Sequence, residues 1–321
     1  MQQDYTYAVA RIRSHETRLL SDSDLSALLS AKDASAVIRL LKDKGWGAGG
    51  DESTDRLLGC EEEKLWALIN EIVPDRTVFA FLLVQNDFHN LKAAIKAITR
   101  GADAQPYFIH NALTDPCELL DALKRRDYPA LPEYLRETAR EAMTVLLQTS
   151  DGQLCDVIID KACMDVVLRL GRDNENELIR MYCELFVVCA DIKTAVRCAK
   201  MRKSRDFILR TLSECDTLDI TRLAAAAATG YQEIIAYLET TEYRSAVPAL
   251  ERSMSAFEKW CDDYLTEMMK PQKWEPFSIG PVVAYIIARQ NEIKAVRMIL
   301  SAKINGLSED MIKERLRMMY V

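Results

Sequence analysis

The same short phrase occurs three times in this chain, at a spacing of about one hundred residues. Its lysines are evenly spaced, because 193 − 92 = 101 and 294 − 193 = 101. In each copy the apolar residues recur at three- and four-residue intervals, which is the spacing of one helix face. The period is longer than the roughly 20–50 residues of ordinary solenoids, so it predicts homologous subdomains. The three copies are DFHNLKAAIK at 87–96, ADIKTAVRCAK at 190–200 and NEIKAVRMIL at 291–300.

A second phrase lies upstream of each copy and places an aromatic residue five positions after a leucine. Its copies are LKDKGW at 41–46, LKRRDY at 123–128 and LETTEY at 238–243. Two phrases in the same order, three times, indicate three similar units. We predict helical repeats at 1–105, 106–205 and 206–321. Three similar units in one chain can close around a pseudo-threefold axis, as the protomers of a cyclic oligomer do.

Helix breakers are scarce, since the 321 residues include 11 glycines and 9 prolines. That share is roughly half the usual one, and no segment shows sustained β alternation. The sequence therefore predicts an all-α fold. The expected helices are 3–20, a helix capped by Ser21 or Ser23 that runs to about residue 44, and 61–72, 75–100, 115–126, 132–149, 153–171, 173–203, 204–213, 219–240, 246–269, 279–302 and 308–319.

The charge balance bears on the class of partner. A net charge of −7 and an isoelectric point near 5.3 argue against nucleic acid as the main partner, because binding its phosphates requires a basic footprint.

No apolar run approaches the roughly 18 residues of a membrane span. The nine cysteines include no C-x-x-C pair. We interpret them as reduced core residues of a cytosolic protein.

Catalytic motifs are missing from the sequence. GWGAGG at 45–50 matches G-x-G-x-x-G, but a predicted helix precedes it where a dinucleotide site needs a strand, so we interpret it as a loop. No phosphate loop, H-E-x-x-H or G-x-S-x-G occurs, and His15, His89 and His110 lack metal-ligand spacing. We expect no enzyme activity, no cofactor, no metal and no small-molecule substrate.

The basic half of each repeated helix is the candidate partner-facing surface, because its lysine recurs while neighbouring positions change. Ion pairs within the chain, or plain solvated surface, are the alternative interpretation. The candidate residues are Lys92, Lys96, Lys193, Arg197, Lys294 and Arg297.

Four segments resemble a known family, the C subunits of archaeal and bacterial V-type (A-type) ATPases, whose eukaryotic counterparts are the d subunits of V-ATPases. The segments extend from Tyr7 to Val321, essentially the whole chain. Asp191 departs from the family, which more often has asparagine there. The segments are YAVARIRSHETRLLSDSDLSALLSAKD at 7–33, DFHNLKAAIKA at 87–97, IGPVVAYIIARQNEIKAVRMIL at 279–300 and IKERLRMMYV at 312–321.

The resemblance implies a funnel-shaped, all-helical protein of three similar subdomains without an active site. It implies a rotor component on the inner, cytoplasmic side of the membrane. That component would link the central-stalk subunits to the membrane proteolipid ring and transmit torque for ATP-coupled proton or sodium transport. Two other hypotheses are a helical scaffold or adaptor outside any rotary ATPase, and a helical enzyme.

Overall fold

The computed structural model describes residues 5–49 and 53–321, and these ranges contain helices and turns but no β-strand. The prediction of an all-α fold is therefore confirmed. The chain forms two compact units, which we call the terminal unit (Met1–Asp75 with Ser245–Val321) and the central unit (Arg76–Arg244). Within the described ranges, none of the helices is sufficiently long and apolar to span a membrane.

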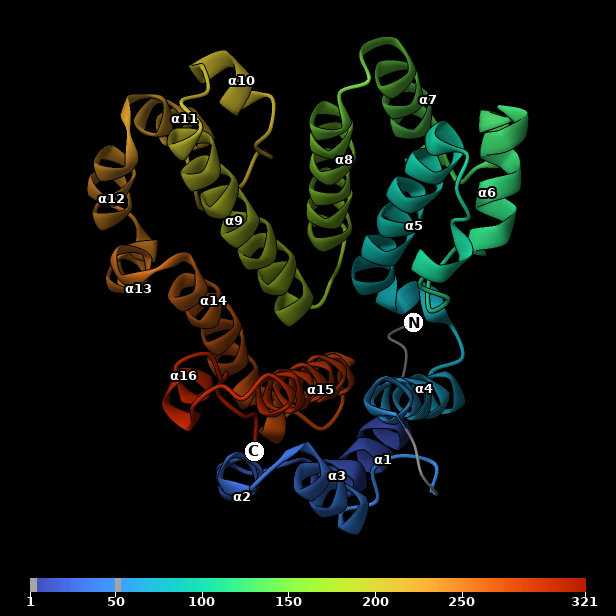
Figure 1. Ribbon diagram of the computed structural model, residues 1–321, viewed down its shortest axis with the longest axis vertical. Helices are drawn as coiled ribbons and strands as arrows, with labels where there is room; N and C mark the ends of the chain where they lie inside the picture. Colours follow the sequence, from blue (N-terminus) through green and yellow to red (C-terminus); the bar gives the residue numbers. More distant parts are fainter. Residues whose placement is uncertain (1–4, 50–52) are drawn as a thin grey trace. The chain divides into compact units, whose positions relative to one another are not determined.

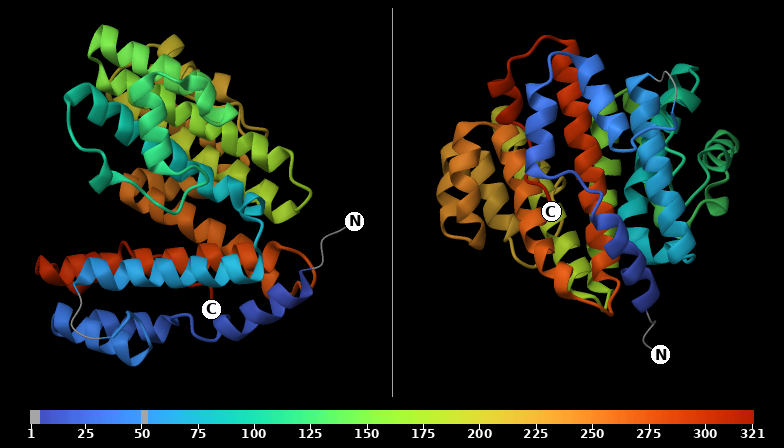
Figure 2. Two further views of the ribbon diagram at one scale, coloured as in Figure 1. Left: turned by 90° about the vertical axis from the view of Figure 1, so that its right-hand side faces the viewer. Right: turned by 90° about the horizontal axis from the view of Figure 1, so that it is seen from below.

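The terminal unit is built around its longest helix, α15. This helix packs against α1, α3 and α4, and Figure 2 shows α15 and α4 lying side by side. The helices of this unit are α1 (Thr6–Glu16), α2 (Asp22–Ser30), α3 (Ala34–Asp43), α4 (Thr54–Ile72), α13 (Val247–Arg252), α14 (Met254–Met269), the 3₁₀ turn η5 (Lys270–Trp274), α15 (Gly280–Ile304) and α16 (Glu309–Lys313).

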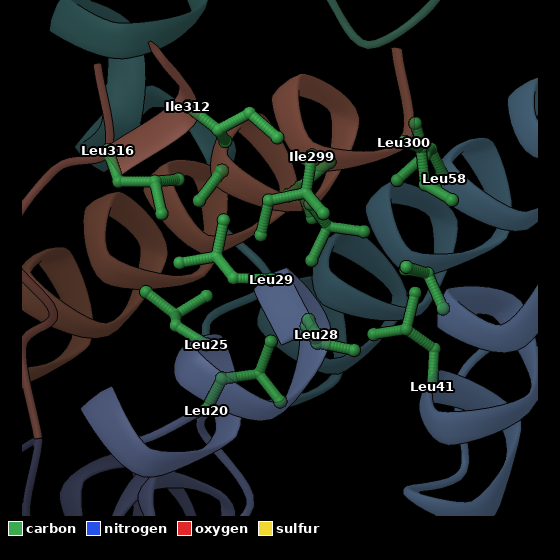
Figure 3. Packing of buried hydrophobic residues seen from close by; sticks show 14 of the residues in the cluster. Leu20, Leu25, Leu28, Leu29, Leu41, Leu58, Ile299, Leu300, Ile312 and Leu316 are labelled. Carbon is green, nitrogen blue, oxygen red and sulfur yellow. The ribbon is translucent and has the colours of Figure 1, made fainter. Parts of the chain in front are cut away.

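A leucine-rich core holds these helices together. Leu29 of α2 lies next to Ile299 of α15, and Leu300 of α15 lies next to Leu58 of α4 (Figure 3); Leu25 and Leu28 belong to the same core. The first half of α15 is buried almost all round, whereas its second half buries one face and exposes the other. The apolar first half of this helix therefore lies in the core, and Lys294 and Arg297 of its second half lie on the exposed face.

The central unit is organised around three long helices, of which α8 packs between α5 and α9 (Figure 1). Its helices are η1 (Arg76–Phe79), α5 (Ala80–Arg100), η2 (Gln105–Tyr107), α6 (Pro116–Arg125), η3 (Tyr128–Ala130), α7 (Glu133–Thr149), α8 (Gly152–Arg172), α9 (Glu177–Lys200), α10 (Arg205–Leu209), α11 (Ile220–Thr229) and α12 (Tyr231–Glu239), with η4 (Glu242–Ala246) at the boundary between the units.

Three predicted helices are wrong as single helices, and a local feature explains each break. Asp33 caps the start of α3, where its carboxylate accepts the Ala36 N–H at 2.9 Å, so α2 and α3 are separate. Gly230 separates α11 from α12 with a φ of 153°. Ser253 is extended and caps α14. The wrong predictions are the helix from Ser21 or Ser23 to about residue 44, which begins at the Ser21 cap but ends at Ser30, and the helices 219–240 and 246–269.

The glycine-rich segment is a turn rather than a dinucleotide loop. Gly45 and Gly47 have φ values of 84° and 82°, which favour glycine, and they follow the end of α3. The interpretation as a loop is confirmed for residues 45–49. Gly50, together with residues 3 and 4 of the first predicted helix, lies outside the described residues.

Candidate partner-binding surface

A buried polar side chain stands two residues before the repeated lysine in every copy. These residues are Asn90, Asp191 and Glu292, and their exposed fractions are 0%, 2% and 1%. Polar groups buried this completely need hydrogen-bond partners. The repeated phrase contains all three, but no role was predicted for them, although their common register relative to the lysine was the available signal.

Asn90 of α5 and Asp191 of α9 each bind the backbone of a segment further along the chain. The Asn90 amide donates to the Ile109 carbonyl and accepts the Ile109 N–H, both at 2.8 Å. The Asp191 carboxylate accepts the Ser213 N–H at 3.0 Å and the Cys215 thiol at 3.7 Å. Each segment then leads into a capped helix, α6 or α11.

Glu292 of α15 performs the same task at the other end of the chain. Its carboxylate accepts the N–H of Leu20, the residue before the capping box that starts α2 at Ser21. All three side chains therefore hold the backbone that enters a short helix. In the first two copies that helix follows the long helix, whereas in the third it belongs to the start of the chain.

The three positions differ in charge. Burial raises the pKa of Asp191 to about 7, and its two hydrogen bonds offset only part of this effect. Burial also raises the pKa of Glu292, against the attraction of the Arg289 guanidinium. Asn90 makes its two backbone bonds without a charge. The copies therefore share a structural role but carry different electrostatics.

Arg289 connects Glu292 to a second buried acid. Its guanidinium pairs with Glu292 and with Glu61 of α4, and it stacks on the Trp46 ring with its central carbon 4.5 Å from the ring centroid. Lys64 also pairs with Glu61, at 2.7 Å. The glycine turn, α4 and α15 are thus joined by charge-assisted hydrogen bonds.

A cavity of about 620 Å³ lies beside this cluster in the terminal unit. Its walls include His15, Arg18, Asp43 and Tyr285, as well as Trp46. The described residues contain no group of three or more His, Cys, Asp or Glu side chains that could hold a metal ion. None of the nine cysteines, all of which lie in the described ranges, is in a disulfide, and burial raises the thiol pKa of several, which makes those poor nucleophiles.

The candidate basic residues fall into two groups. Lys92 and Lys96 of α5 pair with Asp160 and Asp156 of α8 at 2.5 and 2.6 Å, so both contribute to packing inside the central unit. They also line a groove of about 360 Å³ together with the exposed Tyr107.

The remaining candidates lie on α9 and α15. Arg197 and Lys294 are exposed, and Lys193 is half-buried. Arg297 is 3.6 Å from Glu62 of α4, in a pair that is more than half exposed and therefore weak. Within the part of the chain that the structure describes, no ion pair involves Lys193, Arg197 or Lys294. These three residues have charges available to a partner, and the partner-facing assignment stays a prediction.

Comparison with known proteins points to one family. Residues 8–315 match the family described as ATP synthase (C/AC39) subunit. The C subunit of the V-type sodium ATPase of Enterococcus hirae is 23% identical over 96% of this chain and 97% of its own length. The C subunit of the V-type ATP synthase of Thermus thermophilus is 25% identical, with 98% of both chains covered. The C subunit of the A-type ATP synthase of Methanocaldococcus jannaschii is 23% identical over 97% of this chain and 86% of its own. The chain therefore belongs to the ATP synthase (C/AC39) subunit family.

Proposed function

We propose that this protein is a non-catalytic rotor subunit of a V-type or A-type ATPase. In this role it joins the central stalk to the proteolipid ring on the cytoplasmic face of the membrane and transmits torque between ATP chemistry and ion transport. The observation that carries the proposal is the end-to-end family match, since the relatives named as C subunits of such enzymes are covered over 86–98% of their length.

The proposal includes three homologous subdomains, 1–105, 106–205 and 206–321, arranged around a pseudo-threefold axis as a funnel. The common role of Asn90, Asp191 and Glu292 supports it. Each holds the segment entering the next short helix, and the third returns to the first segment of the chain. A repeated contact of this kind is expected when similar units follow one another in a closed order.

Reconstitution tests the rotor role directly. Catalytic head, stalk and proteolipid ring from the same organism are assembled in vesicles with and without this chain. We expect ATP hydrolysis by the head in both samples, ATP-driven ion uptake only when the chain is present, and no hydrolysis by the chain alone. Undiminished ion uptake without the chain would contradict the proposal and favour an adaptor outside the rotary enzyme.

The three basic residues that form no ion pair within residues 5–49 and 53–321 provide the sharper test of the partner-facing surface. A triple variant, Lys193→Glu, Arg197→Glu and Lys294→Glu, should bind stalk or ring about tenfold more weakly, because charge reversal at an interface replaces attraction by repulsion. The control reverses three other exposed charges, Lys32, Lys124 and Arg125. Equal binding by both variants would leave the basic positions as plain surface.

A further inference from the structure

The cavity of the terminal unit lies against the face of α15 that precedes Glu292. Tyr285 and Arg289 line it, seven and three positions before Glu292, and this spacing places the three residues on one face of the helix. The cavity volume of about 620 Å³ falls within the range of small-molecule sites, roughly 300–1,000 Å³. The corresponding helix faces of the other two copies indicate what such a site would hold.

In the first two copies this helix face carries an acid that binds the chain entering the next short helix. Asp87 of α5 stands three positions before the buried polar residue of its copy and accepts the N–H groups of Leu113 and Thr114 at 3.1 and 2.9 Å. Glu184 of α9 stands seven positions before its own and accepts two backbone N–H groups at 216–217, at 2.7 and 2.8 Å. The entering segment therefore covers this face in both copies.

The entering segment is shorter in the third copy. In the first two copies, six positions separate the residue held by the buried polar side chain from the residue that caps the short helix, over 109–115 and 213–219. In the third copy Leu20 directly precedes the cap at Ser21. The shorter segment leaves this face of α15 open, which accounts for the cavity.

The open face also has the opposite hydrogen-bonding character, because Tyr285 and Arg289 carry donors where the other copies carry acids. Arg289 is engaged with Glu61 and Glu292. Tyr285 is 5% exposed, and its hydroxyl has no hydrogen-bond partner within residues 5–49 and 53–321. Burial raises the pKa of this hydroxyl to about 12, so it stays protonated at neutral pH. An occupant of the cavity should therefore bring an acceptor.

The charge of the cavity wall that awaits a partner is that of Arg18. Lys44 and Lys64 also line the cavity, but they pair with Asp24 and Glu61, both at 2.7 Å. Arg18 is exposed and forms no ion pair with any residue that the structure describes. A free guanidinium is suited to a carboxylate or a phosphate, with which it forms paired hydrogen bonds.

Two further side chains of the wall affect what can bind. Burial lowers the pKa of His15, and the nearby Arg18 and Arg11 guanidinium groups add to this effect. The imidazole is therefore neutral at pH 7 and offers both a donor and an acceptor. Asp43 lies on the exposed part of the wall and would repel an anion.

We propose that this cavity binds a small organic oxyanion, a compact molecule that carries a carboxylate or a phosphate group. Arg18 pairs with the oxyanion, and the Tyr285 hydroxyl donates to it. The apolar body of the ligand lies against Leu65, Leu68 and Trp46, which also line the cavity. The proposal does not depend on the rotor role, because it rests on residues of this chain alone.

NMR titration of the full chain, followed at the histidine ring protons, tests the proposal. His15 lines the cavity, whereas His89 and His110 lie in the central unit and serve as internal references. The probes are adenosine monophosphate and benzoate, with adenosine and benzamide as uncharged counterparts, and inorganic phosphate alone. We expect the two organic anions to shift the His15 signal and to raise its pKa, because a nearby anion favours the charged imidazolium. The uncharged counterparts should leave it unchanged, and inorganic phosphate should bind more weakly because it lacks an apolar body.

Substitutions in the wall should change the affinity in opposite directions. Arg18→Ala should weaken binding of the organic anions about tenfold, and Tyr285→Phe about fivefold, since each removes a hydrogen bond to the oxyanion. Asp43→Asn should strengthen binding about threefold, because it removes a like charge. The control is Arg39→Ala, which changes an exposed arginine of α3 outside the cavity wall.

Three results would overturn the proposal. The first is no shift of the His15 signal with either organic anion, or an equal shift with the uncharged counterparts. The second is equal weakening by the Arg18 and Arg39 substitutions, which would assign binding to overall charge. The third is a His15 shift caused by the isolated stalk complex but by none of the probes, since the cavity would then be a protein contact. All three leave the rotor role standing, because the reconstitution experiment tests that role separately.

Discussion

Replacing Asp191 with asparagine should stabilise the central unit at neutral and higher pH. The side chain is buried, and its pKa is raised from 3.8 to about 7 because burial penalises the charged form. A raised carboxyl pKa means that the folded state holds its proton more tightly than the unfolded state. Stability from this group is fully present below pH 4 and is lost as pH rises through about 7.

The magnitude follows from the size of the shift. Each unit of difference between the folded and unfolded pKa is worth about 1.4 kcal/mol of unfolding free energy. The loss of folding stability caused by ionised Asp191 therefore grows with pH and levels off above the folded pKa, at about 4 kcal/mol. Asparagine has nearly the same shape, carries no charge, and can accept the Ser213 N–H as Asp191 does. The stability of the variant should therefore lack this pH dependence, and its advantage over the wild type in unfolding free energy should be largest at about pH 8.

Tryptophan fluorescence does not follow this effect, because Trp46, Trp66, Trp260 and Trp274 all lie in the terminal unit. Hydrogen exchange of the Ser213 amide reports the stability of the central unit around Asp191 directly, and circular dichroism follows the loss of helix on unfolding. The exposed Asp173, also replaced with asparagine, is the control. If the wild type and the Asp191 variant lose stability equally between pH 5 and pH 8, the burial argument is refuted.

Three further substitutions test individual polar contacts. Asn90→Ala removes both bonds to Ile109 and should cost about 2–4 kcal/mol, measured by chemical denaturation and by faster exchange of the Ile109 amide. Arg289→Ala leaves two buried carboxylates without their shared partner and should cost about 3 kcal/mol, which tryptophan fluorescence can follow in the terminal unit. Ser21→Ala removes the cap of α2 and should lower the melting temperature slightly, by an amount corresponding to about 1 kcal/mol.

Helix periodicity predicted most of the fold, because the apolar spacing of the long helices is a local property of the sequence. The breaks at Asp33 and Ser253 were harder to predict, since serine and aspartate also occur inside helices and their capping role depends on the neighbouring backbone. Only the Gly230 break had a clear signal in the sequence, a glycine that can adopt positive φ.

The ion pairs of the candidate surface could not be predicted from their own segments. Lys92 and Lys96 lie 68 and 60 residues from Asp160 and Asp156, and only the packing of α5 on α8 brings them together. Their i, i+4 spacing was visible, but it fits a docking surface and an interhelical ion-pair row equally well. Among the six candidate basic residues, those whose charge remains available to a partner therefore lie on α9 and α15.

The contact made by the third copy of the phrase spans a much longer stretch of sequence than the contacts of the first two. Asn90 and Asp191 hold backbone only 19 and 22 residues away, whereas Glu292 reaches Leu20 across 272 residues. Closing so long a loop costs more entropy than closing a short one, although the cost grows only slowly with length. A charged side chain supported by Arg289 gives a stronger bond than an amide. Loop length alone does not set the charge, because Asp191 is also a carboxylate, and what distinguishes Glu292 is its ion pair with Arg289.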